Sequence, residues 1–330
     1  MNDKINYRSE IIFLYDVTNS NPNGDPFNAN RARIDEETGY CLVTDVRLKR
    51  TIRDYIDNNP KYSDGYDIFI KEVSNEDGTN KNMKARLKDF LPNPNKVFEN
   101  VKKAEAEGKK AILKSCFDIR TFGGVMPVDI KIKDKKDKDK SKSDKGSITI
   151  TGPTQFGIGK SLHPVRENLI SLSLTMATKD ESKTGSLAEG GKPGIKYGLI
   201  GFHGVINENV AKETLMDERD VDVLLKGIWE GTRNLLTTSK KGHMPRLLIK
   251  VDYTDGYFVG DLLDRVSLDS KGKESAAFDS PKDYSVDVTE LNSALKKADG
   301  LGYLAKVSVL KDDFLELSDE IYNAEALKIK

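Results

Sequence analysis

An apolar strand, a dense turn and an amphipathic helix follow one another early in this chain, and that order most constrains its fold. Residues 9–17 are rich in β-branched and aromatic side chains, which predicts a buried strand. Asn, Pro, Gly and Asp crowd residues 19–26, which predicts a turn. Apolar residues then recur at helical spacing over 44–57, where Thr44 is placed to cap a helix.

The later patterns extend this beginning into a mixed α+β fold. Strands are expected at 148–151, 169–178, 196–207, 246–254 and 303–310, and helices at about 217–236 and from Asp287. A strand–helix–strands–helix–strand order is typical of a ferredoxin-like or RRM-like sheet. We therefore expect residues 1–330 to form one modified RRM-like palm that carries insertions.

Four segments stand apart from this palm. Residues 59–111 are polar and predict an inserted, mostly helical finger lobe. Residues 129–146, with eight lysines and four aspartates over 131–145, predict a mobile surface loop because they offer almost nothing to bury. Residues 170–197 predict a protruding hairpin, and the acidic tail 311–330 is expected to be helical.

Hydropathy and cysteine content exclude several classes of protein. The mean hydropathy is −0.55 and no apolar run approaches 18 residues, so no membrane-spanning helix is expected. The two cysteines, Cys41 and Cys116, are too far apart in the chain to suggest a disulfide framework or a cysteine zinc site. These features suit a cytoplasmic protein.

The net charge is zero, but the two signs are unevenly distributed. Residues 1–250 carry 43 Lys and Arg against 36 Asp and Glu, whereas residues 251–330 carry 10 against 17. A basic body with an acidic end could bind a polyanion, a basic protein surface or further copies of itself. Solvated faces alone produce similar imbalances.

Two sequence patterns resemble catalytic or nucleotide-binding motifs without completing them. Residues 155–161 include Gly-Lys-Ser, but Thr154 stands where a phosphate-binding loop needs glycine. His163, His203 and His243 are 40 residues apart, without the paired spacing of a zinc site. No cofactor, metal or nucleophile–base set is predicted, although nucleotide binding by residues 157–161 stays open as an alternative.

Basic side chains gather beside turns that expose backbone. This arrangement suits phosphate contacts that hold a strand without reading its bases. On the helix at 44–57, Arg47, Lys49 and Arg50 could equally pair with Asp45 and Asp54 on a solvated face.

Several blocks together resemble a known family. They are Asn21-Pro22-Asn23-Gly24-Asp25-Pro26, residues 43–55, Asp118 to Gly123, Ile150 to Gln155, Tyr197-Gly198-Leu199 and Phe202-His203-Gly204. In this order they resemble the backbone subunit of Cascade, the type I CRISPR effector complex, which is the seventh Cas family, most closely its I-B and I-C branch.

The resemblance implies a non-catalytic, CRISPR RNA-binding subunit with a palm, a finger lobe and a thumb hairpin at 170–197. Its copies would stack head-to-tail along the guide and present it to target DNA. The implied partners are the CRISPR RNA, target DNA, copies of the chain, and the 5′-handle-binding, large and small subunits of Cascade. No membrane partner is implied.

The candidate RNA-binding residues combine the basic clusters, the turn and the Gly-rich strand. They are Asn21, Asn23, Gly24, Arg31, Arg33, Arg47, Lys49, Arg50, Arg53, Arg120, Gln155, Lys160, Ser161, His163, Arg166, Met176, Lys240 and Lys241. The alternative is a metal-dependent endoribonuclease of a CRISPR system that uses Asp25 or His203.

Overall fold

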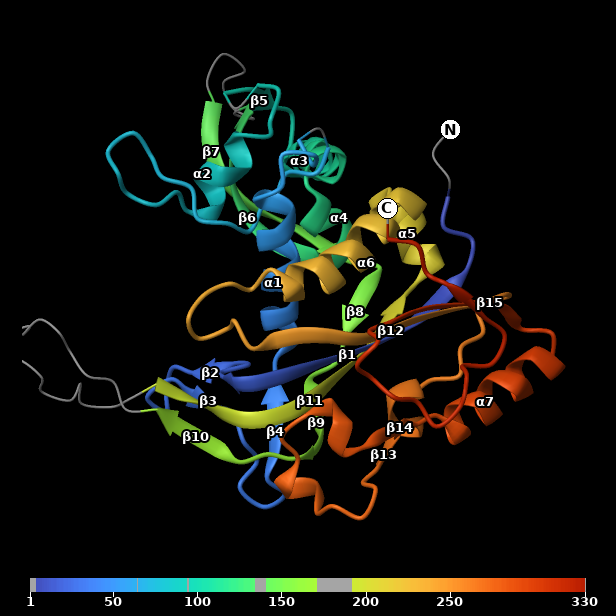
Figure 1. Cartoon of the computed structure of the whole chain (residues 1–330). Coiled ribbons are helices and arrows are strands. Elements are labelled where there is room, and N and C mark those ends of the chain that lie inside the picture. The colour runs from blue at the N-terminus through green and yellow to red at the C-terminus, as the bar shows by residue number, and fades with distance from the viewer. Residues whose placement is uncertain (1–3, 64, 94, 134–140, 171–191, 330) are drawn as a thin grey trace, which may run out of the picture. The chain divides into compact units, whose positions relative to one another are not determined.

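The computed structural model describes residues 4–63, 65–93, 95–133, 141–170 and 192–329 (Figure 1). The chain separates into two compact units, each assembled from several segments. The first unit comprises Met1–Asn6, Arg53–Gln155 and Val205–Leu224, and the second comprises Tyr7–Ile52, Phe156–Gly204 and Leu225–Lys330. The α+β class expected from the sequence is confirmed, because helices and a large sheet both contribute.

A nine-stranded sheet lies mostly in the second unit. Its strands are β1 (Arg8–Ser20), β4 (Tyr40–Val43), β8 (Thr154–Phe156), β9 (Gly159–Pro164), β10 (Glu167–Ile170), β11 (Lys192–Ile206), β12 (His243–Tyr253), β15 (Leu304–Lys311) and β16 (Ala324–Ala326). The main path runs β16–β15–β12–β1–β11–β9–β4, and β8 and β10 also pair with β11. β1 is therefore interior, and Ile11 to Leu14 are fully buried, as the apolar run predicts.

Helices and short ribbons complete the elements around this sheet. The predicted helix at 44–57 is confirmed as α1 (Asp45–Asp57), and the one at 217–236 as α6 (Glu218–Arg233). The predicted cap of α1 is also present, because Thr44 Oγ1 accepts a hydrogen bond from the Arg47 amide at 3.3 Å. The remaining elements are β2 (Gly24–Asp25), β3 (Arg31–Ala32), β13 (Ser267–Asp269), β14 (Ser285–Asp287), α7 (Thr289–Gly300) and 3-10 turns at Leu262–Arg265, Ser275–Ala277 and Pro281–Asp283.

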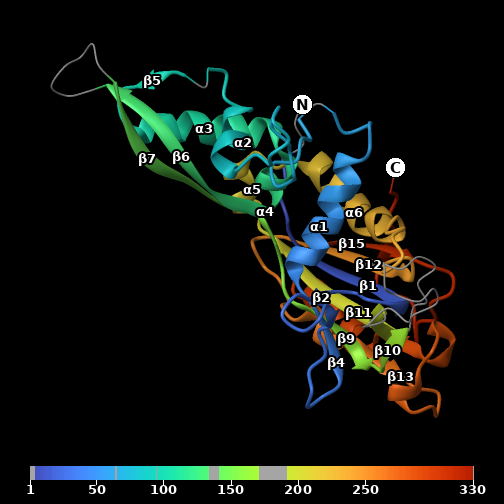
Figure 2. The same cartoon turned by 90° about the vertical axis from the view of Figure 1, so that its left-hand side faces the viewer.

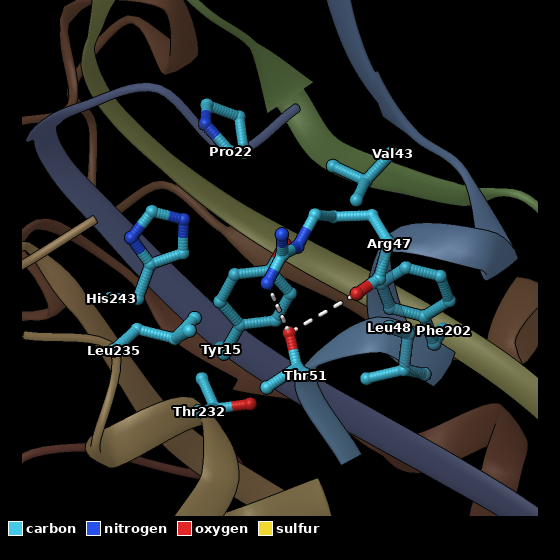
Figure 3. A pocket seen from close by; sticks show the side chains of 10 residues that line it. All are labelled: Tyr15, Pro22, Val43, Arg47, Leu48, Thr51, Phe202, Thr232, Leu235 and His243. Atoms are coloured by element: carbon cyan, nitrogen blue, oxygen red, sulfur yellow. Dashed lines mark hydrogen bonds between the residues drawn. The ribbon is translucent and has the colours of Figure 1, made fainter. Parts of the chain in front are cut away.

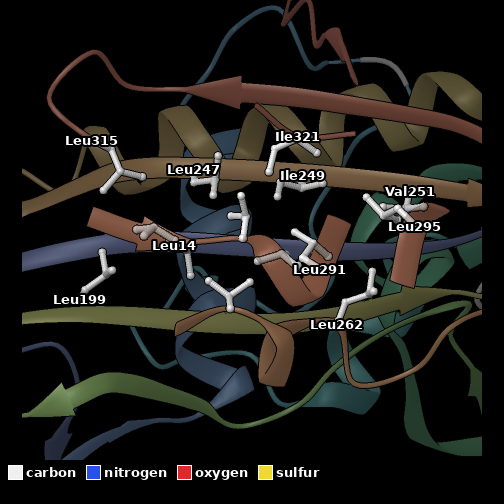
Figure 4. Close-up of a cluster of buried hydrophobic side chains, with 14 of the residues drawn as sticks. Leu14, Leu199, Leu247, Ile249, Val251, Leu262, Leu291, Leu295, Leu315 and Ile321 are labelled. Atoms are coloured by element: carbon white, nitrogen blue, oxygen red, sulfur yellow. The ribbon is translucent and has the colours of Figure 1, made fainter. Parts of the chain in front are cut away.

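The main core of the second unit lies between the sheet and α7 (Figure 4). Leu14 and Leu247 from neighbouring strands pack with Leu295 of α7 in one buried cluster. Leu315 and Ile321 of the acidic tail enter the same cluster.

The tail corrects an expectation, since the structure places no helix within residues 312–329. It instead adds β16 parallel to β15, and the Ser318 amide donates to the Val286 carbonyl at 2.8 Å. Over these described residues the tail has no helical conformation, and its few apolar residues enter the core from a non-helical backbone. Their burial therefore does not depend on the spacing of a helix.

The first unit is built on a long hairpin of β6 (Gly123–Lys133) and β7 (Ser141–Thr151). Figure 2 shows α3 lying along this hairpin. Ile112 of α3 packs with Met126 and Ile148 of the two strands in a second core cluster. The other elements are α2 (Met83–Lys88), β5 (Val97–Phe98), α3 (Val101–Ser115), α4 (Phe117–Phe122) and α5 (Glu208–Thr214).

The hairpin occupies part of the segment expected to be a charged loop. Residues 129–133 and 141–146 lie in paired strands, with Asp129 opposite Lys145. Ile132 is 8% exposed and joins the core cluster. One apolar residue therefore anchors this strand end while the backbone ladder holds its polar neighbours. Residues 134–140 lie outside the described part of the chain.

The base of the hairpin expected at 170–197 is described. β10 pairs antiparallel with β11, and Ile170 lies opposite Lys192. The tip, including Met176, lies outside the described residues, so the predicted role of Met176 stays a prediction.

Candidate nucleic-acid interface

The predicted turn after β1 is fastened to the first residue before α1. Asn23 Oδ1 accepts hydrogen bonds from both the amide and the hydroxyl of Thr44, each at 2.9 Å. A Cβ on Gly24 would lie 2.9 Å from the Asn30 carbonyl oxygen, closer than such contacts normally come, so the backbone favours glycine there. Asn23 and Gly24 thus shape the backbone beside α1.

The same turn is fastened to the loop before β12. The Asn21 amide donates to the Ser239 carbonyl at 3.0 Å. Lys240 Nζ donates to the carbonyl oxygens of Asn21 and, at 2.9 Å, of Pro22. The turn, residues 44–52 at the start of α1 and residues 237–242 therefore form one connected surface within the second unit.

A small pocket of about 10 Å³ opens between these elements, which is enough for about one water molecule. Figure 3 shows the Arg47 side chain reaching into it toward Tyr15. Arg47 Nη2 donates to Thr51 Oγ1 at 3.0 Å. The lining residues are Tyr15, Pro22, Val43, Arg47, Leu48, Thr51, Phe202, Thr232, Leu235 and His243.

His243 closes one side of this pocket as a neutral ring. It stacks on Tyr15 with 5.7 Å between ring centroids, and its Nδ1 lies 2.6 Å from the Lys240 carbonyl oxygen. Burial, with help from Lys240, lowers the pKa of His243 to about 3. Its Nε2 is buried and has no hydrogen-bond partner among the described residues.

Arg47, which lines the pocket, and Lys240, which binds the Asn21 and Pro22 carbonyls beside it, bring two positive charges to this region. Burial, followed by repulsion from Arg47, lowers the pKa of Lys240 to about 7. Two cationic side chains held close enough to repel each other create a site that favours an anion.

Other predicted residues lie on exposed parts of the same unit. Lys160 sits 4.3 Å from the centre of the Tyr40 ring. Arg50, Arg166 and Lys241 are exposed. Lys49 pairs with Asp45 at 2.9 Å, Arg31 with Glu167 at 2.9 Å, and Arg33 with Asp25 at 3.5 Å.

Four predicted residues are buried in structural roles instead. Arg53 pairs with the fully buried Asp118 at 2.9 Å, and Arg120 binds both oxygens of Asp220 at 2.7 and 2.8 Å. Ser161 Oγ donates to the His163 carbonyl at 2.7 Å. His163 accepts the Leu199 amide at Nε2, and burial lowers its pKa. These side chains cannot reach a ligand without breaking those contacts.

Gln155 belongs to the first unit, where its Nε2 donates to the Gly152 carbonyl at 2.9 Å. This bond closes the turn between β7 and β8. Gln155 is exposed.

The described residues contain no group of three or more His, Cys, Asp or Glu side chains that could hold a metal ion. Asp25 Oδ1 accepts the Phe27 amide at 3.1 Å, which stabilises the turn. His203 Nε2 lies 2.9 Å from Glu10 Oε1. Across the part of the chain that the structure describes, no helix is long and apolar enough to cross a membrane.

Comparison with known proteins identifies the family of this chain. The profile of the family described as "CRISPR-associated protein Cas7" matches residues 7–289. The chain belongs to the Cas7 family. A Cas7 protein of Haloferax volcanii is 34% identical over 326 residues, which cover 96% of this chain and 91% of the relative. The resemblance to the Cas7 family stated from the sequence is thereby confirmed.

Solved structures support the Cas7 fold. A chain of a "CRISPR RNA-guided surveillance complex" matches with a TM-score of 0.50 and 12% identity, covering 97% of this chain and 93% of that chain. A chain of a "CRISPR RNA-guided surveillance complex, pre-nicking" matches with a TM-score of 0.50 and 10% identity, covering 98% and 97%.

Sequence reasoning missed three parts of the pocket in this Cas7-family chain. The sequence places Tyr15 in a strand and Thr51 in a helix without linking either to the cations, and it considers His243 only as a candidate zinc ligand without the required spacing. The available signal was the closeness of His243 to Lys240 in the sequence. The stacking of His243 on Tyr15 joins elements that are distant in sequence, so no local pattern reveals it.

Proposed function

We propose that this chain is the RNA-holding backbone subunit of a type I surveillance complex of the I-B or I-C branch. Its copies stack head-to-tail on a CRISPR RNA and present the guide to target DNA without cleaving RNA. The observation that carries the proposal is the closeness of the cations Arg47 and Lys240 beside the turn after β1. A site of this kind holds phosphate whatever the base sequence, as a variable guide requires.

The strand order supports an RRM-like palm within this proposal. In the sheet, β12, β1, β11 and β9 are consecutive neighbours, while α1 follows β1 and α6 precedes β12 along the chain. This is the spatial order 4-1-3-2 of a ferredoxin-like unit. The hairpin that begins at β10 and ends in β11 would be the thumb, and the first unit would contain the finger lobe.

The proposed RNA contacts follow exposure and charge. Arg47 and Lys240 would hold one phosphate, with Arg50, Lys160, Arg166 and Lys241 extending the positive surface. Arg31, Arg33 and Lys49 would exchange their present carboxylate partners for phosphate. The 5′-handle-binding, large and small subunits are the further partners proposed.

Co-expression with a CRISPR array and the partner subunits tests the proposed function. A discrete short RNA should co-purify with the assembled complex and remain intact when divalent cations are added. Protein that purifies with its partner subunits but without nucleic acid would contradict the proposal, and degradation of the RNA would favour the endoribonuclease.

Salt dependence tests the proposed phosphate site. Arg47→Ala should weaken binding of single-stranded RNA and reduce the slope of log affinity against log salt by about 0.7 for the lost contact. Lys103→Ala is the matched control, since Lys103 of α3 is 61% exposed and pairs with Glu99, which precedes the helix. An unchanged slope for Arg47→Ala would remove Arg47 from the interface.

A further inference from the structure

The turn between β2 and β3 presents an aromatic ring to solvent. Phe27 is 97% exposed, more than any other large apolar side chain of the described residues. A lone exposed apolar side chain is ordinary. Phe27 differs from such a residue because the rigid turn between β2 and β3 holds it next to the connected surface that carries the cations.

The rigidity of this turn follows from its hydrogen bonds. The Asp25 carbonyl accepts the amides of Asn28 and Asn30 at 3.0 and 2.9 Å, and the Asp25 carboxylate accepts that of Phe27. Ala29 and Asn30 both adopt left-handed backbone conformations, with φ of 46° and 57°. Such conformations persist only where the surrounding contacts enforce them.

Neighbouring elements hold the turn from three sides. Asn21 Nδ2 donates to the Asn30 carbonyl at 2.7 Å, and the Asn21 and Pro22 carbonyls accept Lys240. Arg31 pairs with Glu167 of β10 at 2.9 Å. The backbone that carries Phe27 is thus held rigidly, which lowers the conformational entropy lost when a partner covers the ring.

Two other exposed apolar side chains lie in or next in sequence to the same connected surface. Val46 in the first turn of α1 is 64% exposed, and Leu236, just before the Lys240 loop, is 74% exposed. Apolar side chains interleaved with cations suit single-stranded nucleic acid, whose bases stack while its phosphates meet positive charge.

We propose that Phe27 is a stacking platform for an unpaired nucleobase of the RNA held at Arg47 and Lys240. The inference rests on the proposed function and adds a base contact to its phosphate site. A nucleobase is favoured over a protein surface because the cations Arg31, Arg33 and Lys240 contact or adjoin the residues that form and support the turn. A phenylalanine ring offers no hydrogen bond, so it accepts any base, as a guide of variable sequence requires.

Binding of purified full-length protein to a uridine oligomer tests the platform. Phe27→Ala should weaken binding by about 5- to 150-fold, the range of one base–aromatic stack, and leave the salt slope unchanged because no phosphate contact is lost. Phe27→Tyr should restore the affinity. The melting temperature should stay constant because the ring is exposed, so lost binding would not reflect unfolding.

Fluorescence supplies a direct readout of stacking. In Phe27→Trp, the uridine oligomer should quench the new indole, while the buried Trp229 stays unaffected. Phe314→Trp is the control, because Phe314 is 64% exposed on another loop and should not be quenched.

The outcomes separate the inference from the proposed function. Unchanged affinity of Phe27→Ala together with unquenched Phe27→Trp would overturn the platform, while an Arg47-dependent salt slope would still support the phosphate site. An indole signal that changes with protein concentration without RNA would assign Phe27 to contact between copies and overturn the platform. Failure to bind any RNA would overturn both proposals.

Discussion

At the scale of residues, burial decides which arginines and lysines can serve a ligand. Arg120 uses its guanidinium on Asp220 and on the carbonyls of Gly65 and Leu113, so its hydrogen-bonding capacity is used inside the first unit. Lys240 instead donates hydrogen bonds to two carbonyl oxygens and is repelled by the charge of Arg47. Carbonyl dipoles compensate a buried ammonium less well than a carboxylate does.

The lowered pKa of Lys240 predicts a pH dependence of RNA binding. Below a pH of about 7 the ammonium is present in the free protein, and above it the free protein loses the charge that a phosphate needs. Affinity should therefore fall as pH rises from 7 toward 9, by up to about tenfold per unit. Titrations of wild type and Lys240→Met over this range check the effect. A profile that Lys240→Met leaves unaltered would contradict it.

The lowered pKa of Lys240 affects the stability of the fold with the opposite dependence on pH. Between a pH of about 7 and the ordinary Lys pKa of 10.5, the unfolded chain binds more protons than the folded one at this position. The free energy of unfolding should therefore rise with pH through this window, as far as Lys240 contributes. Stability and RNA affinity should move in opposite directions.

The buried Arg120–Asp220 pair predicts a large loss of stability on truncation. Arg120→Ala leaves a carboxylate that is 3% exposed without its partner, and should lower the free energy of unfolding by about 3–5 kcal/mol. Replacing both residues with Leu should cost less than either single change. Urea unfolding measures these differences. Lys84→Ala is the control, since its pair with Asp129 is exposed and should matter little.

At the scale of elements, the β6–β7 hairpin predicts two different deletion phenotypes. Removing residues 131–145 takes away Ile132, which is 8% exposed, and the pairing of Lys131 and Ile132 with β5. The melting temperature should fall by several degrees. Removing only 134–140, which contain no apolar residue, should change it little. Thermal unfolding of both deletions decides, and equal melting temperatures would contradict this account.

The elements also show what local patterns can predict. The helix of 44–57 and its Thr44 cap were predictable because 3.6-residue spacing and an N-terminal hydroxyl are local signals. The tail could not be predicted in the same way. Leu315 and Ile321 bind to a core that distant segments create, so tertiary contacts override the helical propensity of an acidic sequence.

At the scale of the whole molecule, the proposed role of the β10–β11 hairpin as a thumb predicts an assembly defect. Gly194 lies in β11, where a Cβ would approach the Ser20 carbonyl carbon to 2.9 Å, so the replaced segment should end before β11. Replacing residues 179–190 with a short Gly-Ser turn should leave a folded protein that binds isolated RNA weakly. It should fail to form long regular arrays on a guide. Electron microscopy of RNA-bound particles checks this; arrays of normal length would contradict the bridging role.

The interface was predictable as a set of cations but not as a site. Arg47 and Lys240 were both expected from turns and charge, yet Arg53 and Arg120 looked equivalent in sequence. What distinguishes Arg53 and Arg120 from Arg47 and Lys240 is a buried ion pair. Folding brings Asp118 into contact with Arg53, and Asp220 into contact with Arg120, from distant parts of the sequence. Phe27 was not singled out, since exposure of an aromatic residue is a property of the folded turn.

The central place of β1 has a consequence for synthesis on the ribosome. Residues 11–14 need β11 and β12 as neighbours, with Ile12 paired to Ile249. At about 5–20 residues per second, these strands emerge roughly 10–50 s after β1. The core cluster of the first unit uses only residues 69–150 and can form during this interval. The growing chain therefore carries a folded lobe and a bare apolar strand at once, which makes it a substrate for chaperones that shield such strands.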